Sequence, residues 1–267
     1  MTTLPITVCI PVLNEERNLP ACLAALGGAF HEVVVIDSGS TDATRQIARD
    51  AGATLLEFHW NGSYPKKRNW ALDHRDFATP WVLFLDADER VSPAFIAEAA
   101  RAVANDAYVG YWISYNNYFM GRRLRYGDVF RKLSLFRRDA GRYERFPEES
   151  WSQLDMEVHE HPVLTGPVSE ISVRIQHFDE RGLEHYVAKH EEYAAWEANR
   201  WEWLQHAGDD AWRQLTPRQK FKYRSLNKWW LPWTYFLVSF VGKRGFLDGI
   251  PRGSLIEASR RREGLEE

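Results

Sequence analysis

The sequence has few of the residues that stabilise small secreted or zinc-bound domains, with only two cysteines and three methionines among 267 residues. Two cysteines cannot build a disulfide framework, and the sequence holds no Cys-x-x-Cys pair or Cys/His quartet that would bind zinc. No apolar run approaches the length of about 18 residues that a transmembrane helix needs. The early apolar stretch is interrupted by Pro11, Glu15 and Glu16, so we expect no signal peptide and a reducing, cytoplasmic setting.

Internal repeats and low-complexity tracts are also absent from the sequence, which excludes solenoids and flexible linkers. Apolar residues make up 45% of the chain and the formal net charge is only −3, so the chain can bury a sizeable core. Its length suits one large domain, with or without a smaller appendage. The twelve tryptophans are an excess, and indole suits both sugar stacking and membrane interfaces.

Charge is distributed unevenly along the chain. Residues 211–262 hold 12 Lys and Arg but only two acidic residues, Asp248 and Glu257, so the rest of the chain is acidic. We therefore interpret 211–267 as a basic, aromatic, helical extension with an anionic partner. Basic residues beside aromatic ones favour an interfacial helix on an anionic membrane leaflet. A solvated helix pair over the sheet is an alternative, whereas nucleic-acid binding is not expected because no such motif is present.

The first hundred residues alternate between strand and helix signals. Apolar and β-rich runs predict four strands, at residues 6–10, 32–36, 54–58 and 81–85. Helices are predicted between them, one capped by Asn14 and the next entered through Ser40 or Thr41. This alternation indicates an α/β fold with a mixed, mostly parallel sheet flanked by helices, which binds ligands beyond the carboxyl ends of its strands.

The second half of the chain changes character. Strand-like alternation recurs at residues 108–119, 132–136 and 171–178, and a long helical pattern follows at 182–206. We place a boundary near residue 105, between a nucleotide-binding-like half (1–105) and an acceptor-like half (106–210) of one domain. The extension, 211–267, follows this domain.

Acidic residues directly follow two of the predicted strands. Asp37 follows the second strand, and Asp86 and Asp88 follow the fourth. In the turn after the strand, one carboxylate of the pair can face a metal while the other holds a ribose or the turn. Hard divalent cations prefer oxygen ligands and would neutralise a diphosphate. An acidic turn that only caps the next helix is the alternative, but Ser92 followed by Pro93 supplies a better cap.

Four segments, in this order, resemble family 2 glycosyltransferases, which are inverting enzymes of the GT-A fold that use nucleotide-sugar donors. The segments are Val8–Glu16 (VCIPVLNEE), Val35–Asp42 (VIDSGSTD), Lys67–Asn69 (KRN) and Phe84–Glu89 (FLDADE). Two later segments, Val158–Glu160 and Lys243–Gly249, resemble more loosely the lipopolysaccharide core β-1,4-glucosyltransferase subgroup (WaaE/LgtF type).

The resemblance also implies roles for individual residues toward a UDP-sugar donor and a metal ion. They are Pro11, Asn14 and Glu15 in the nucleotide pocket, Asp37 at the uracil or ribose, Arg68 at the base or diphosphate, Asp86 at the ribose, and Asp88 on Mg²⁺ or Mn²⁺. His177 is a candidate to complete the metal shell, although a lone histidine is more often structural. Equally ordinary explanations exist for Arg68, as part of a solvated helix face, and for Pro11, as the end of a strand.

Inversion needs a general base that takes the proton of the acceptor hydroxyl opposite the leaving diphosphate. The candidate carboxylates are Asp155, Glu157 and Glu160. Glu160 matches the subgroup position, so we assign the base to it and keep Glu157 and Asp155 as alternatives. The histidines of this segment could instead bind a metal or sugar hydroxyls. Trp151, just before it, is a candidate for packing against an acceptor sugar.

The expected activity is that of a metal-dependent inverting glycosyltransferase. The expected donor is UDP-glucose, and the expected acceptor is a lipid-linked glycan such as the lipopolysaccharide inner core. The enzyme would be peripheral at the inner face of the cytoplasmic membrane. A transferase that acts on a polyprenyl phosphate and a non-catalytic scaffold that binds nucleotide-sugars are the alternatives.

Overall fold

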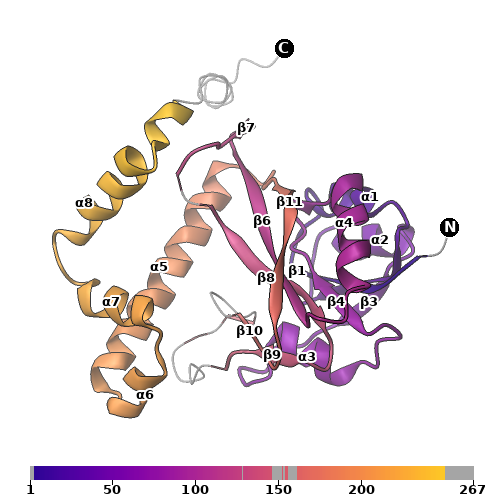
Figure 1. Ribbon diagram of the computed structural model, residues 1–267, viewed down its shortest axis with the longest axis horizontal. Coiled ribbons are helices and arrows are strands. Elements are labelled where there is room, and N and C mark those ends of the chain that lie inside the picture. The colour runs from indigo at the N-terminus through magenta and orange to yellow at the C-terminus, as the bar shows by residue number, and fades with distance from the viewer. Residues whose placement is uncertain (1–2, 128, 146–151, 153, 156–160, 250–267) are drawn as a thin grey trace. The chain divides into compact units, whose positions relative to one another are not determined.

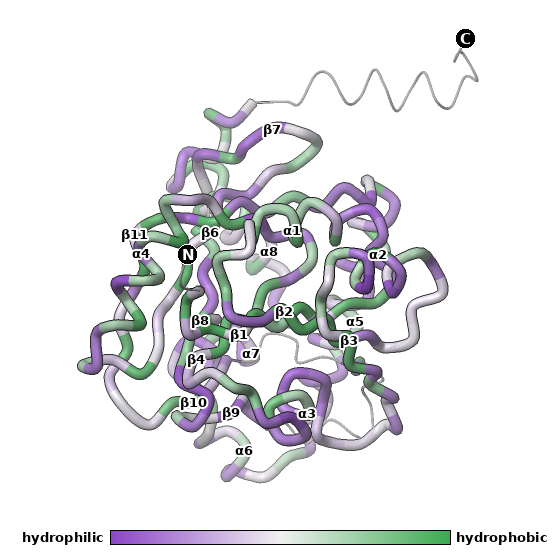
Figure 2. Tube along the Cα trace, turned by 90° about the vertical axis from the view of Figure 1, so that its right-hand side faces the viewer, coloured by the Kyte–Doolittle hydropathy of each residue, from purple (hydrophilic) through white to green (hydrophobic). Residues whose placement is uncertain are grey.

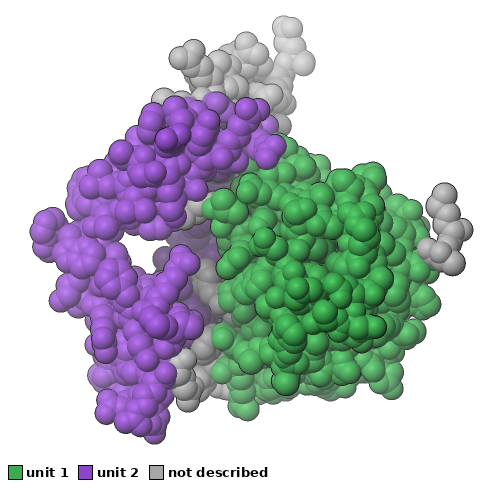
Figure 3. All heavy atoms as spheres, viewed as in Figure 1, with its two compact units in different colours: residues 1–119, 129–149, 153–180 green, residues 120–128, 150–152, 181–267 purple. Residues whose placement is uncertain are grey.

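The computed structural model describes residues 3–127, 129–145, 152, 154–155 and 161–249, and the chain divides into two compact units (Figure 3). Unit 1 comprises residues 1–119, 129–149 and 153–180, and unit 2 comprises residues 120–128, 150–152 and 181–267.

Unit 1 is built on a mixed, mostly parallel sheet flanked by helices, which confirms the predicted α/β fold (Figure 1). The hydrogen-bonded order is β3-β2-β1-β4-β8-β6-β11-β5. The strands are β1 (Leu4–Val12), β2 (Phe30–Asp37), β3 (Thr54–Glu57), β4 (Trp81–Phe84), β5 (Glu89–Arg90), β6 (Gly110–Phe119), β8 (Arg131–Arg137) and β11 (Val168–His177). β1 is parallel to β2 and β4, whereas β8 is antiparallel to β4 and β6. A separate antiparallel pair joins β9 (Gly141–Tyr143) to β10 (Pro162–Leu164).

Helices cover both faces of the sheet, because the central strands are apolar on both sides. On β1, Ile6, Val8 and Ile10 face one core and Cys9, between them, faces the other. The first core also contains residues of α1 (Leu19–Leu26), α2 (Thr44–Asp50) and α4 (Pro93–Val103), and the second contains residues of α3 (Lys67–His74). Figure 2 shows the hydrophobic residues gathered along β1 and β2. This two-sided burial fixes where the strands end and where their turns emerge.

Two helix starts differ from the sequence prediction. Asn14 does not cap a helix, since its backbone is left-handed (φ 55°) and α1 begins only at Leu19. Likewise, α2 begins at Thr44 rather than directly after Ser40 or Thr41. These polar side chains bond to the neighbouring loop instead: Asn14 Oδ1 accepts the Thr41 N–H at 2.8 Å, and Ser40 Oγ accepts the Asn14 N–H at 2.9 Å. The loops after β1 and β2 therefore hold each other in place.

Unit 2 is largely helical. Its elements are α5 (Leu183–His206), α6 (Asp209–Gln214), α7 (Pro217–Ser225), α8 (Leu231–Phe236), the π-helix η1 (Leu237–Gly242), the 3-10 helix η2 (Gly245–Asp248) and the short strand β7 (Arg122–Arg123). Leu204, Leu215 and Tyr223 form a small buried core, whereas α8 and η1 bury none of their residues. No helix within the described residues is long and apolar enough to cross a membrane.

The loop after β7 is fixed within unit 2 by a buried carboxylate. Asp248 accepts the backbone N–H groups of Arg125 at 2.8 Å and Tyr126 at 3.0 Å, and the Gly127 N–H donates to the carbonyl oxygen of Lys243 at 3.1 Å. We call this arrangement the Asp248 clamp. It gives the Lys243–Gly249 segment a clear local role, which is to hold residues 125–127.

Candidate functional site

The candidate site is formed by the turns that follow β1, β2 and β4. These strands are parallel neighbours in the order β2-β1-β4, so their carboxyl ends meet at one edge of the sheet. The chain passes from β1 to β2 on one side of β1, whereas β4 pairs with β1 on its other side. In α/β sheets, ligands bind in the crevice at such a change in strand order. Asp37 ends β2, and Asp86 and Asp88 follow β4, so both predicted acidic turns reach the same edge.

The loop after β1 is preorganised. The Glu15 N–H donates to Thr44 Oγ1 at 2.7 Å, and the Glu15 carboxylate accepts from the buried Asn18 amide at 2.9 Å. Pro11 lies inside β1, in register with Ile36 of β2. Asn14 and Glu15 are therefore presented on a rigid backbone, and a ligand that bound there would not have to order the loop.

Asp37 is fully buried and accepts several hydrogen bonds. The N–H groups of Gly39 and Ser40 lie 3.1 Å from its carboxylate oxygens, and Arg45 Nε donates at 2.6 Å. Burial alone would raise the pKa of Asp37, but the bonds from Ser40 and Arg45 hold the pKa below its usual value. Asp37 is therefore ionised and stabilises the turn that follows β2.

Lys67 links α3 to the ends of β1 and β2. Its side chain is buried, and its Nζ lies 3.0 Å from Asp155 Oδ2 and donates to the Val12 carbonyl oxygen at 3.3 Å. The Ser38 hydroxyl donates to the same Asp155 oxygen, and the Lys67 backbone N–H donates to the Asp155 carbonyl at 2.9 Å. Burial lowers the pKa of Lys67, although Asp155 opposes this shift. Asp155 is thus tied to the edge of the sheet where the turns after β1 and β2 emerge.

Asp86 lies between two cations from different elements. Arg68 Nη2, on α3, bonds Asp86 Oδ1 at 3.0 Å, and Lys132 Nζ, on β8, bonds Asp86 Oδ2. The Arg68 guanidinium also lies 5.3 Å from the centroid of the Tyr143 ring. Although burial disfavours the charged form of Lys132, Asp86 and Glu89 raise the pKa of Lys132 well above its usual value. Both cations are therefore charged and close to the turn after β4.

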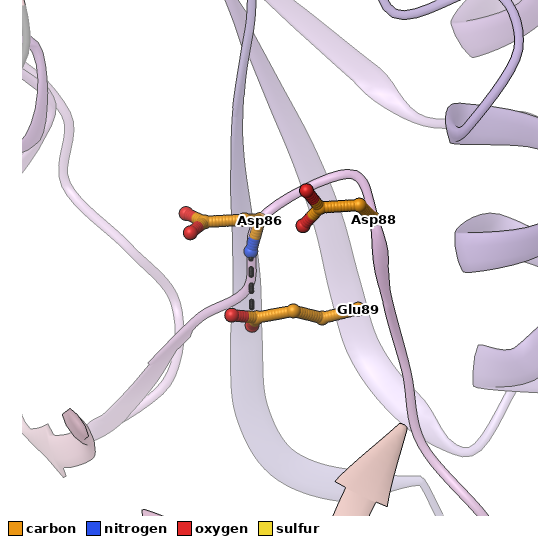
Figure 4. A group of neighbouring side chains, drawn as sticks. All are labelled: Asp86, Asp88 and Glu89. Carbon is orange, nitrogen blue, oxygen red and sulfur yellow. Dashed lines mark hydrogen bonds between the residues drawn. The ribbon is translucent and has the colours of Figure 1, made fainter. Parts of the chain in front are cut away.

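The carboxylates of Asp86, Asp88 and Glu89 form one cluster, with an oxygen of each lying within 4.8 Å of the others. Figure 4 shows the three side chains extending in the same direction from the chain after β4. Glu89 is 1% exposed, accepts the Asp86 N–H at 3.1 Å and bonds Lys132 Nζ at 2.8 Å. Burial raises the pKa of Glu89 to about 7. The turn therefore concentrates negative charge where the protein excludes water.

His177 reaches this cluster from the far edge of the sheet. It ends β11, where it is in antiparallel register with Glu89 of β5. Its Nε2 lies 3.4 Å from Asp88 Oδ2, and Asp88 itself is only 4% exposed. Burial opposes the charged form of His177, but Asp88 raises the pKa of the imidazole above its usual value. The sequence candidates Asp88 and His177 are therefore neighbours in space.

This donor set fits a hard divalent cation. Carboxylate oxygens are the ligands that Mg²⁺ and Mn²⁺ prefer, and an imidazole nitrogen is also acceptable to Mn²⁺. Arg68 and Lys132 offset part of the negative charge of the cluster, and both cations lie beside the carboxylates that could hold a metal ion. A site with both fixed cations and metal-binding carboxylates is suited to hold a diphosphate.

Comparison with known proteins decides the family. The model described as Glycosyl transferase family 2 matches residues 7–152, which is more than half of the chain and includes most of β1, all of β2 and β4, and the acidic cluster. The chain belongs to glycosyltransferase family 2. The lipopolysaccharide core biosynthesis glycosyltransferase LpsC of Rhizobium meliloti is 30% identical over 205 residues, which are 73% of this chain and 71% of LpsC.

Other family relatives match over shorter stretches. An undecaprenyl-phosphate 4-deoxy-4-formamido-L-arabinose transferase of Aeromonas hydrophila is 32% identical over 107 residues, which are 36% of this chain and 33% of that protein. The structure of glucosyl-3-phosphoglycerate synthase from Mycobacterium tuberculosis, in complex with Mn²⁺, UDP-glucose and phosphoglyceric acid, matches with a TM-score of 0.33 at 23% identity. That match covers 42% of this chain and 43% of the synthase, so this chain spans less than half of the synthase.

The predicted site residues of this family 2 glycosyltransferase fall into three groups. The first group lies in or beside the acidic cluster and comprises Arg68, Asp86, Asp88 and His177. The second lies in the adjoining strands and turns and comprises Pro11, Asn14, Glu15, Asp37 and Asp155. The third, Trp151, Glu157 and Glu160, lies outside the described residues. The base assigned to Glu160 therefore remains a prediction.

Two residues of the cluster, Glu89 and Lys132, were not singled out from the sequence. Glu89 stands next to Asp88, but its burial comes from the pairing of β5 with β11, which no local pattern reveals. Lys132 is the second residue of β8, and it reaches the cluster because β8 runs antiparallel beside β4. In the sequence, Lys132 only follows another basic residue, Arg131, at the start of a strand that also ends in Arg137, so it does not stand out.

Replacing Lys132 with Met is expected to destabilise the enzyme by about 3 kcal/mol in EDTA, because Asp86 and the buried Glu89 lose their shared cation. Mn²⁺ should restore part of this loss, since a divalent cation neutralises the same carboxylates. Denaturant unfolding with EDTA and with Mn²⁺ measures both effects. Lys220→Met, on α7, is the matched control and should behave as wild type in both buffers. A Lys132→Met protein of wild-type stability in EDTA would contradict this account of the cluster.

Proposed function

We propose that this protein is a metal-dependent inverting glycosyltransferase that moves glucose from UDP-glucose to a lipid-linked glycan, such as the inner core of lipopolysaccharide. The observation that carries the proposal is the cluster of Asp86, Asp88 and Glu89, bordered by Arg68 and Lys132, at the carboxyl end of β4. Membership of family 2 and the similarity to LpsC, a lipopolysaccharide core biosynthesis glycosyltransferase, support the choice of substrates.

Cationic and anionic side chains have separate tasks at the donor. Arg68 offers a fork of N–H groups that matches phosphate oxygens, and Lys132 offers a compact charge beside it. Both are held by Asp86 before the donor arrives, so little reorganisation is needed when the diphosphate binds. Asp88, with His177 beside it, would hold Mg²⁺ or Mn²⁺, which when bound supplies Lewis-acid neutralisation of the leaving diphosphate.

The acceptor hydroxyl must lose its proton to a base on the side of the sugar opposite the diphosphate. We assign this role to Glu160, with Glu157 as the alternative. Asp155 is less suited, because its carboxylate is already held by the Ser38 hydroxyl and the Lys67 ammonium group.

Calorimetric titration with UDP, once with Mn²⁺ and once with EDTA, tests the donor site. We expect UDP to bind at least about tenfold more tightly with Mn²⁺, because an ion held by Asp88 would supply counter-charge for the diphosphate. Equal affinity in the two titrations would support the nucleotide pocket but contradict the metal site. Complete lack of binding would exclude UDP as the donor nucleotide, and GDP- and CMP-linked donors would be tested next. Slow hydrolysis of UDP-glucose separates an enzyme from a binding scaffold.

We further propose that residues 1–210 carry out catalysis and that residues 211–267 contact the inner face of the cytoplasmic membrane. Eight exposed large apolar residues support the contact, and they are Trp229, Trp233, Tyr235, Phe236, Leu237, Val238, Phe240 and Val241. Trp229 is 81% exposed and Trp233 is 65% exposed, which is costly for indole in water but favourable at a lipid interface. Lys228, Lys243 and Arg244 flank the group and would attract anionic headgroups.

Sedimentation with vesicles tests this contact. The protein should bind vesicles of phosphatidylcholine and phosphatidylglycerol, and Trp233→Ser should weaken binding by about tenfold, since one buried indole is lost. Val163→Ser, at a 61% exposed apolar position on β10, is the matched control and should bind as wild type. Equal binding by all three proteins would exclude the α8–η1 surface as the contact.

The similarity to an undecaprenyl-phosphate transferase favours one alternative acceptor, a polyprenyl phosphate. The phosphate oxygen of such an acceptor is already ionised, so transfer to it requires no general base. Substitution of Glu160 should therefore reduce transfer to a glycan hydroxyl but not transfer to a polyprenyl phosphate.

A further inference from the structure

A cleft of about 430 Å³ is lined entirely by residues of unit 2. Its volume falls within the range of small-molecule sites, roughly 300–1,000 Å³. The lining combines two indoles, two side-chain amides and two cations, which are Trp201, Trp212, Gln205, Asn227, Arg224 and Lys228. None of these residues belongs to the proposed donor site, and only Lys228 also belongs to the proposed membrane contact.

The two indoles are held rigidly. Trp201 and Trp212 are half-buried and pack against the small core of Leu204, Leu215 and Tyr223. Trp212 Nε1 donates to the Leu204 carbonyl oxygen at 2.9 Å, which fixes the plane of its ring. An aromatic face fixed in this way can receive the C–H face of a sugar ring without further loss of side-chain entropy.

The cleft also carries an excess of positive charge. Arg224 and Lys228 are exposed, and neither forms an ion pair with a carboxylate within the described part of the chain. The Arg224 guanidinium lies 5.7 Å from the centroid of the Trp212 ring, so one cation stands directly beside the stacking surface. Asp209 is the one carboxylate among the lining residues, and it can accept bonds from sugar hydroxyls.

We propose that this cleft binds a sugar phosphate. The sugar ring packs on the indoles, the phosphate lies between Arg224 and Lys228, and the amides of Gln205 and Asn227 bond the ring hydroxyls. A guanidinium and an ammonium match a phosphate dianion in charge, and the guanidinium matches it in geometry. The proposal uses residues of unit 2 alone and does not depend on the proposed donor or acceptor.

Calorimetry of the full chain with glucose 6-phosphate, glucose and inorganic phosphate tests the cleft. Glucose 6-phosphate should bind at least about tenfold more tightly than either glucose or phosphate, because only it engages both the indoles and the cations. The double variant Arg224→Gln with Lys228→Gln should lose at least about tenfold in affinity. Arg218→Gln with Lys220→Gln removes the same charge from α7 but leaves the cleft lining unchanged, and it should bind as wild type.

Three results would overturn the proposal. If glucose 6-phosphate gives no measurable heat of binding, the cleft does not bind a sugar phosphate. Inorganic phosphate binding as tightly as glucose 6-phosphate would show that no sugar is recognised. Equal weakening by the two double variants would reduce the effect to general electrostatic attraction. The variants lie in the cleft lining or elsewhere on α7, and none lies in the proposed donor site, so a failure here is distinguishable from a failure of UDP to bind.

Discussion

Asp88→Asn is expected to lower the turnover of UDP-glucose by about a thousandfold while leaving the fold intact. The amide is a poor ligand for a hard cation, so the leaving diphosphate loses its counter-charge. The backbone bond that Asp88 makes, from the Phe178 N–H to its carbonyl oxygen at 2.8 Å, is retained in the variant. The rate of UDP-glucose hydrolysis or transfer measures the loss, and thermal unfolding checks the fold.

Asp50→Asn, at the end of α2, makes the same chemical change outside the cluster and should keep normal turnover. The tighter binding of UDP with Mn²⁺ should also disappear in Asp88→Asn and persist in Asp50→Asn. If the Asp88→Asn protein folds and keeps near-normal turnover, Asp88 is not an essential metal ligand, whatever affinity the variant has for UDP.

Glu160→Gln is expected to reduce transfer by about 10²–10⁴-fold, because the acceptor hydroxyl then has no base. UDP affinity should stay within about twofold of wild type, since the proposed donor site consists of other residues. Transfer to the acceptor and calorimetry with UDP, measured on the same preparation, separate the two effects. A variant that loses UDP affinity instead would point to a structural role for Glu160.

Parallel variants of the other carboxylates make this result specific. Glu157→Gln should retain most of its activity if Glu160 is the base, and a reversal of the two effects would move the assignment to Glu157. Asp155→Asn should act mainly through stability, because it breaks contacts to Lys67 and Ser38. Substantial activity in all three variants would favour a polyprenyl phosphate as the acceptor.

Much of unit 1 could be predicted from the sequence, because its central strands are buried on both faces and therefore appear as continuous apolar runs. The cap predicted at Ser92 is also confirmed, with Ser92 Oγ accepting the Phe95 N–H at 3.2 Å. The acidic turn after Trp81–Phe84 was recognisable since it directly follows such a run. These features depend on residues close together in the chain.

What could not be predicted depends on residues far apart. Lys132 reaches Asp86 only because β8 lies between β4 and β6, and strand order is not encoded in local periodicity. Asn14 was expected to cap a helix because its side chain suits that role, but its actual partners are Ser40 and Thr41 in another loop. A short polar side chain has several ways to bond backbone groups, and the tertiary fold selects among them.

The Asp248 clamp bears on how the protein should be shortened. Residues 125–127 belong to the connection between β6 and β8, and their backbone N–H groups donate to Asp248 and Lys243. Removing the exposed apolar helices to improve solubility, by a truncation after α7, would also remove these acceptors. Proteases that cleave after arginine would then find Arg125 on a segment that has lost the acceptor of its backbone N–H. An engineered form of this enzyme should therefore replace the apolar side chains of α8 and η1 by polar ones and keep the chain through Gly249.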